Sequence, residues 1–188
     1  MLPDIELQDK MFYWFFERTE RHITLVQKYC KRLSLLKDLE GILERGEDHD
    51  MSKFEAEEAE PYMWLSWWHK SKAESKSTFE MPEDIKNRIK EATLHHILSN
   101  RHHPEFHQER KVDLLNNEDR DKPPKRIVDA TRMENLDIAE MVADWCAMSE
   151  EKGNTPVEWA EANVNIRWKF TEQQTLNIYK YIHSIWKE

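Results

Sequence analysis

Apolar residues recur at steps of three and four positions along this chain, and this period constrains the fold more than any other feature. Residues 12–33 would form a long helix with one buried stripe, and residues 133–150 a second periodic segment. Only 3 glycines and 7 prolines occur among 188 residues, which disfavours turn-rich β architectures. The sequence therefore predicts an all-α fold, a bundle of helices.

Several helix ends can be placed from the sequence. A helix over residues 35–45 is expected to end at Gly46 as its left-handed cap. Another is expected to begin near Pro82, with carboxylates in its first turn, and to stop near Asn100. On that helix His96 shares a face with apolar residues, so we expect His96 to point inward.

The remaining segments complete the predicted organisation. Residues 70–77 are expected to form a polar loop, residues 116–125 an exposed loop, and the acidic run from Glu55 to Glu60 a solvated face. Two aromatic-rich helices are expected over residues 155–188. No break in composition divides the chain, so we expect a single domain over residues 1–188.

Charge and hydropathy exclude some classes of partner. The formal net charge of −9 argues against binding to duplex nucleic acid, which needs a basic surface. No run of 18 apolar residues and no signal-peptide layout occurs, so we expect a cytoplasmic protein without a membrane partner. Cys30 and Cys146 lie in helical apolar patterns and are expected to be buried free thiols. The 8 tryptophans allow an apolar interface, so a homo-oligomer is compatible with the sequence.

The polar residues that could carry chemistry are of the types that bind metals. Imidazole nitrogens and carboxylate oxygens are the ligands that hold Zn, Mn, Fe or Mg in proteins. A pocket that collects several of them needs a cation to offset their charge. The candidates, which together predict a divalent-metal site, are His22, the dipeptide His49–Asp50, the pairs His95–His96 and His102–His103, and Asp144.

The order of these residues resembles that of the HD-domain metal-dependent phosphohydrolases. The resemblance covers roughly residues 15–150, which follow the order His, His-Asp, further histidines, Asp. More narrowly, His-Asp-Met-Ser-Lys-Phe, His-His-x-x-x-Asn-x-His-His and Glu-Met-Val-Ala-Asp-Trp are similar to the motifs of small HD-like proteins of bacteria and phages. The resemblance implies an HD-like helical bundle with a metal site between helices, on which residues 155–188 pack.

The resemblance also implies a role for each candidate. The core metal would be held by His22, His49, Asp50 and Asp144, and a second ion would recruit two histidines from the intervening pairs. We favour His96, from its helical phase, and His103 from the second pair. The cofactor would be one or two divalent ions of Mn, Mg, Co, Ni, Zn or Fe. The residues expected to orient a ligand or contact the substrate are His95, His102 and Arg101.

The chemistry of such a site favours hydrolysis of a phosphoester. A bound cation lowers the pKa of coordinated water from about 15.7 toward about 7 and stabilises the phosphoryl transition state. Asp50 could orient or deprotonate that water, and Lys53 could bind a phosphate oxygen or remain a solvated lysine. We therefore expect a phosphohydrolase acting on a small phosphorylated molecule, most simply a nucleotide. An HD-fold di-iron oxygenase and a non-catalytic metal-stabilised binding domain remain as alternatives.

Overall fold

The computed structural model describes residues 5–74, 79–108 and 126–186 of the chain. These residues are mostly α-helical, which confirms the all-α fold class. The chain divides into two compact units, Met1–Arg21 with Asp50–Ser99 and His22–His49 with Asn100–Glu188. The single domain expected over residues 1–188 stays a prediction.

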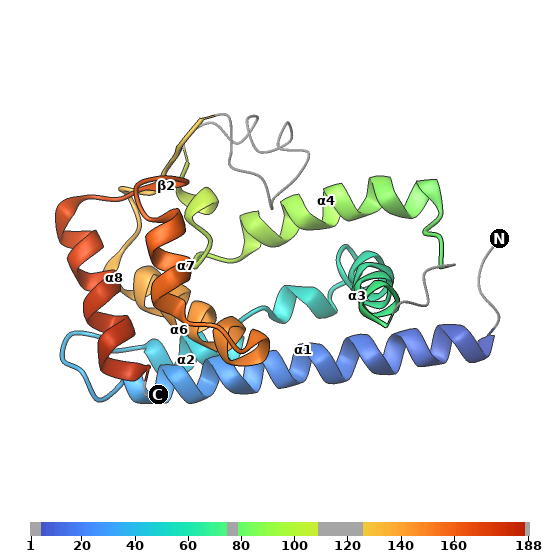
Figure 1. Ribbon diagram of the computed structural model, residues 1–188, viewed down its shortest axis with the longest axis horizontal. Coiled ribbons are helices and arrows are strands. Elements are labelled where there is room, and N and C mark those ends of the chain that lie inside the picture. The colour runs from blue at the N-terminus through green and yellow to red at the C-terminus, as the bar shows by residue number, and fades with distance from the viewer. Residues whose placement is uncertain (1–4, 75–78, 109–125, 187–188) are drawn as a thin grey trace. The chain divides into compact units, whose positions relative to one another are not determined.

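The first unit is built around two packed helices. It comprises the N-terminal part of α1 (Ile5–Leu33), the 3-10 helix η1 (Met51–Phe54), α3 (Ala59–Ala73) and α4 (Glu83–Ser99). Helices α3 and α4 pack on each other and both contact η1 (Figure 1). Met11 of α1 shares the core of this unit with Trp64, Met81 and Ile85.

Helix α6 (Asn135–Lys152) is the central helix of the second unit. It packs on α8 (Glu172–Ile185), on α7 (Pro156–Asn163) and on α2 (Ile42–Asp48). The seven consecutive residues 137–143 are all buried, so neighbouring elements cover every face of this helix for nearly two turns. The C-terminal part of α1 contributes Val26, Cys30 and Leu33 to the same core.

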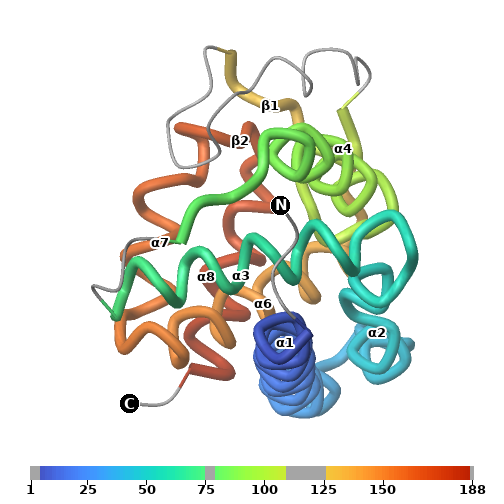
Figure 2. Tube along the Cα trace, turned by 90° about the vertical axis from the view of Figure 1, so that its right-hand side faces the viewer, coloured from blue at the N-terminus to red at the C-terminus, as the bar shows by residue number. Residues whose placement is uncertain are grey.

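Two very short strands connect distant parts of the second unit. Strand β1 (Val128–Asp129) pairs in parallel with β2 (Trp168–Lys169), with Val128 opposite Trp168 (Figure 2). The side chain of Gln174 donates hydrogen bonds to the carbonyls of Thr131 (3.1 Å) and Met133 (2.9 Å). These contacts hold the segment before α6 to the C-terminal part of the chain. The sequence predicted only helices over residues 155–188, so strand β2 was not expected.

A helix is present near the predicted range 35–45, but its predicted bounds are wrong. Residues 34–41 form turns, and α2 begins at Ile42. Gly46 lies inside this helix and packs on α1, since a Cβ atom there would lie 3.0 Å from Cys30 Cβ. Of Gly41 and Gly46, the one with the left-handed conformation is Gly41 (φ 90°), which precedes the helix. Gly46 therefore allows close packing of the helix and is not the cap that the sequence pattern predicted.

Other boundaries agree with the sequence more closely. Helix α4 begins at Glu83 and ends at Ser99, as predicted, and His96 is buried. Two predictions differ from the structure. Helix α3 extends to Ala73, into the segment predicted to be a polar loop, and Phe12, predicted to lie on the buried stripe, is 51% exposed. The predicted loop over residues 116–125 lies outside the described residues. Cys30 and Cys146 are buried free thiols, as predicted.

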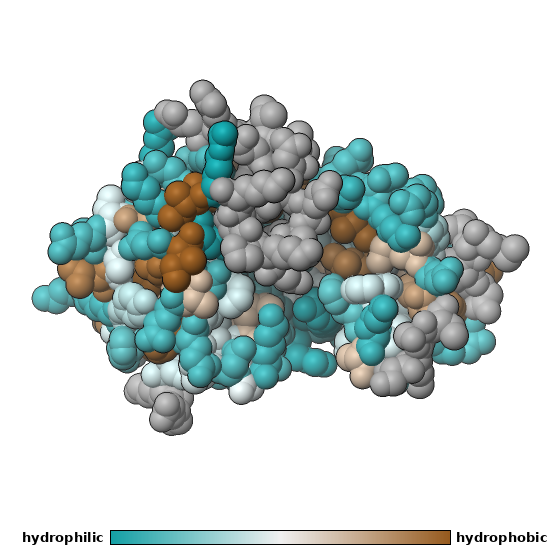
Figure 3. Space-filling model, turned by 45° about the horizontal axis from the view of Figure 1, so that its top comes forward, coloured by the Kyte–Doolittle hydropathy of each residue, from teal (hydrophilic) through white to brown (hydrophobic). Residues whose placement is uncertain are grey.

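The surface agrees with the acidic, polar composition of the chain. On the face shown in Figure 3, the described residues are mostly hydrophilic, with apolar side chains in small separate groups. Among the described helices, none is long and apolar enough to cross a membrane.

Candidate metal centre

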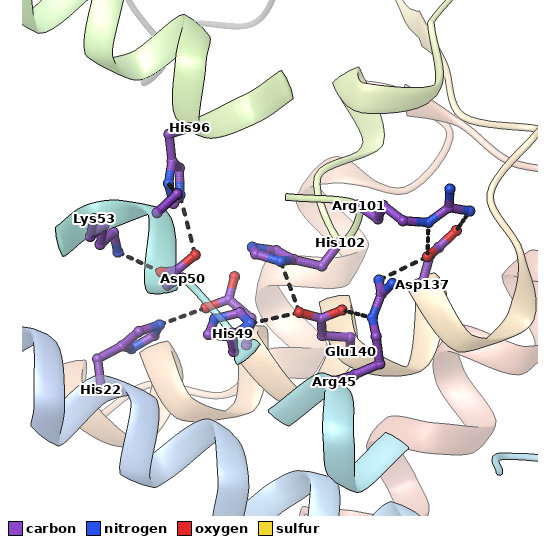
Figure 4. A network of polar contacts seen from close by, with 12 residues as sticks. His22, Arg45, His49, Asp50, Lys53, His96, Arg101, His102, Asp137 and Glu140 are labelled. Atoms are coloured by element: carbon purple, nitrogen blue, oxygen red, sulfur yellow. Dashed lines mark hydrogen bonds and ion pairs between the residues drawn. The ribbon is translucent and has the colours of Figure 1, made fainter. Parts of the chain in front are cut away.

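Three buried histidines come close together in the second unit. His22 lies on α1, His49 follows the last residue of α2, and His102 lies in the turn before the 3-10 helix η2 (Pro104–His107). Their side chains are 8%, 0% and 2% exposed, respectively. The ring centroids of His22 and His49 are 5.6 Å apart, and those of His49 and His102 are 4.3 Å apart (Figure 4). Burial of three imidazoles in one place is costly unless each has a polar partner.

His22 and His49 form a potential metal site with Asp144 of α6. One ligand atom from each residue lies within 4.8 Å of the others, and His22 Nε2 is 3.1 Å from Asp144 Oδ1. Burial raises the pKa of Asp144, but the contact with His22 and the nearby His49 and His102 outweigh it and lower this pKa to about 2. An ionised carboxylate with two imidazoles could bind a divalent cation and would leave coordination positions open. The donor set therefore fits the predicted metal.

Glu140, which was not among the candidates from the sequence, joins two of these histidines. Its Oε1 accepts hydrogen bonds from His49 Nδ1 (2.9 Å) and His102 Nδ1 (3.1 Å), and its Oε2 accepts one from Arg45 Nε (2.6 Å). Burial raises the pKa of Glu140, but the hydrogen bonds from His102 and His49 outweigh it and hold this pKa well below its usual range. The structure thus holds a carboxylate charge against the Nδ1 side of two rings.

A chain of ion pairs continues from Glu140 toward the surface of the second unit. Arg45 Nη2 donates to Asp137 Oδ1 (2.8 Å), and Arg101 donates to both oxygens of Asp137 (3.0 and 3.1 Å). The hydrogen bond to Asp137 raises the pKa of Arg101 above its usual value. Arg101, expected to orient a ligand or contact the substrate, is therefore part of a structural network in which Arg45 is the central cation (Figure 4).

In the first unit, Asp50 contacts two other candidates. Its Oδ1 is 3.3 Å from His96 Nε2, and its Oδ2 accepts a hydrogen bond from Lys53 Nζ (2.5 Å). Asp50 has a left-handed backbone (φ 57°), an uncommon conformation for a residue with a side chain. Lys53, predicted either to bind phosphate or to be solvated, is 19% exposed and pairs with Asp50, and its role stays a prediction.

Glu58 organises the first histidine pair, also within the first unit. Glu58 is fully buried, so the prediction that the acidic run from Glu55 to Glu60 is solvated is wrong for this residue. Its two oxygens contact His95 Nδ1 (2.7 Å) and His96 Nδ1 (2.9 Å). The hydrogen bond with Glu58 raises the pKa of His95, whereas burial lowers that of His96. Glu58 therefore orients both rings.

The second histidine pair differs in the surroundings of its members. His103 caps η2 and is half-buried, and its ring centroid is 4.2 Å from that of His102. His102 is more deeply buried and contacts Glu140. The assignment of His96 and His103 to a second ion stays a prediction. For two of the missed residues, Asp137 and Glu140, the sequence offered one signal, because both are carboxylates on the apolar face of the helix predicted at 133–150.

The fold and these contacts define an all-α protein with buried His, Asp and Glu groups that could bind a metal ion. The chain belongs to the family described as "Family of unknown function (DUF5662)", whose sequence model matches residues 11–185. Comparison with curated proteins and with solved structures gave no match.

Proposed function

We propose that this protein is a metal-dependent phosphohydrolase of the HD type that acts on a small phosphorylated molecule. The observation that supports the proposal most directly is the approach of His22, His49 and Asp144 within the second unit. These are three of the four residues that the HD resemblance assigns to the core metal. They come from three separate helical segments, so sequence proximity does not explain their meeting.

The residues of the site have separate tasks in this proposal. When bound, a divalent ion supplies a Lewis acid and a coordinated water of lowered pKa. Asp144, held ionised, would offset the charge of the cation, and His22 and His49 would bind it through ring nitrogens. Asp50 would orient the attacking water, and its partner Lys53 would exchange that contact for a phosphate oxygen. The proposed substrate is a nucleotide, whose phosphoester bond would be hydrolysed.

Metal reconstitution tests this proposal. The protein is stripped with a chelator and supplied in turn with Mn, Mg, Co, Ni, Zn or Fe(II), and metal uptake is measured by calorimetry. Phosphate release is then followed on a panel of nucleotides. We expect uptake of at least one ion and hydrolysis that requires it. The variant Asp144→Ala should lose both, whereas Asp84→Ala, which removes an exposed carboxylate of α4, should keep both.

Each alternative predicts a different result. An iron-dependent product that also requires dioxygen would replace the phosphohydrolase with a di-iron oxygenase. Metal uptake that raises the melting temperature without turnover of any nucleotide would indicate a non-catalytic binding domain. Absence of metal uptake by the intact protein would reject the metal centre itself.

A further inference from the structure

We propose that Glu140 is a positioning residue that orients His49 and His102 together, so that both rings direct Nε2 toward the metal centre. The proposal adds His102 to the residues that could ligate the metal, whereas the sequence favoured His103 of the same pair, for a second ion. It rests on the metal centre of the proposed function. Figure 4 shows Glu140 between the two rings and the guanidinium of Arg45.

The geometry of the two rings carries the first step. His49 and His102 approach the same atom, Glu140 Oε1, and each does so through Nδ1 (2.9 and 3.1 Å). Their planes are 34° apart, and their centroids are 4.3 Å apart. Two roughly parallel rings with Nδ1 on one shared oxygen carry both Nε2 atoms on the side away from that oxygen. Glu140 thus sets the direction of both rings at once.

The identity of the acceptor fixes the ring tautomers. An ionised carboxylate only accepts hydrogen bonds, so the proton of each neutral ring is on Nδ1. Nε2 then carries the lone pair that a metal requires. Carboxylates that hold the far nitrogen of a metal-binding histidine in this way commonly change metal affinity 10- to 100-fold when removed.

Glu140 itself is better placed to orient ligands than to be one. Its Oε1 already accepts two hydrogen bonds, and its Oε2 is paired with Arg45 Nε at 2.6 Å. A guanidinium that close disfavours a divalent cation on the same carboxylate, because like charges repel strongly where little water screens them. Asp144 has His22 Nε2 beside it instead, so Glu140 and Asp144 have different roles.

Histidine tautomers in the metal-free protein test the proposal directly. Protein labelled with ¹⁵N-histidine is examined at pH 8 by long-range ¹H–¹⁵N correlation spectra, with signals assigned from His49→Gln and His102→Gln. We expect both rings to carry Nδ1–H in the unsubstituted protein. Glu140→Met, which removes both acceptor oxygens at similar volume, should shift both rings away from this tautomer. Glu140→Gln, which keeps one acceptor oxygen, should retain part of it.

Calorimetric titration with Mn²⁺ and Co²⁺ provides the second readout. We expect about tenfold weaker metal binding for Glu140→Gln and up to about 100-fold for Glu140→Met. The control Glu150→Gln removes another carboxylate of α6, which contacts Lys28 and Tyr29, and should match the unsubstituted protein in both readouts. Circular dichroism checks that each variant is folded, and if Glu140→Met does not fold, Glu140→Gln decides.

The outcomes separate this proposal from the proposed function. Unchanged tautomers and unchanged metal affinity in Glu140→Gln would overturn the positioning role while leaving the metal centre intact. No metal uptake by the unsubstituted protein would reject the proposed function, and the positioning role toward a metal would fall with it. Loss of stability without a change of tautomer would show that Glu140 has only a structural role.

Discussion

Arg45 should contribute more to stability than any exposed cation among the residues that the structure describes. It donates to Glu140 and Asp137 at 2.6 and 2.8 Å, and the side chains of these carboxylates are only 5% and 1% exposed. Removing one partner of a buried ion pair typically costs about 3–5 kcal/mol. Arg45 is 24% exposed and Arg101 still holds Asp137, so we expect Arg45→Leu to lower the free energy of unfolding by about 3 kcal/mol, the low end of that range.

The measurement is urea unfolding followed by circular dichroism, with Arg88→Leu as the control. Arg88 pairs with Glu60 at a similar distance, 2.7 Å, but the side chains are 42% and 45% exposed. Such a pair is worth about 0–1 kcal/mol. Adding Glu140→Gln to Arg45→Leu should recover part of the loss, because the carboxylate left without its guanidinium is then neutral. Equal losses in the two arginine variants, or additive losses in the double variant, would refute the reasoning from buried charge.

Three further predictions concern packing, pH and the thiols. Gly46→Ala should lower the unfolding free energy by about 1–2 kcal/mol, because overpacking against Cys30 exceeds the gain in helix propensity. In urea unfolding, the losses of Gly46→Ala and Cys30→Gly should be less than additive in the double variant, because Cys30→Gly removes the Cβ atom that the new methyl group meets. Hydrogen bonds from Lys28 and Tyr29 lower the pKa of Glu150. The contribution of Glu150 to stability should therefore be present above about pH 4.3 and be lost as pH falls through the lowered pKa. Glu150→Gln should flatten this part of the pH–stability curve, and an unchanged curve would contradict the prediction. Burial raises the pKa of Cys30 and Cys146 to about 12, so neither thiol should react with a disulfide reagent at pH 8 until urea unfolds the protein, and rapid reaction of the native protein would disprove their burial.

The helices that carry the candidate site were largely predictable from the sequence because their end signals are local. Helix α4 starts after Pro82, as its first-turn carboxylates indicate, and ends before Asn100. Helix α6 was expected over residues 133–150 and spans Asn135–Lys152, with Gly153 as its left-handed cap. Period and caps depend only on neighbouring residues, so one sequence is enough to place them.

The contacts that join separate helices were not predictable in the same way. Glu58 lies in a run of acidic residues that has no apolar period, yet it is fully buried because two histidines almost 40 positions later need its oxygens. Arg45 was expected at the end of a helix over residues 35–45, but its partners lie more than 90 positions away, which no local pattern indicates. Gly46 was interpreted as a cap from its position after the predicted helix. Its close approach to Cys30 could not be predicted, because such a contact leaves no pattern in the local sequence.

The sharing of Glu140 by two rings has a consequence for how this family can vary. Since one oxygen serves both His49 and His102, a change at either ring alters the environment of the other. Substitutions at the two positions should therefore be epistatic, and among related sequences we expect the three residues to be kept together or replaced together.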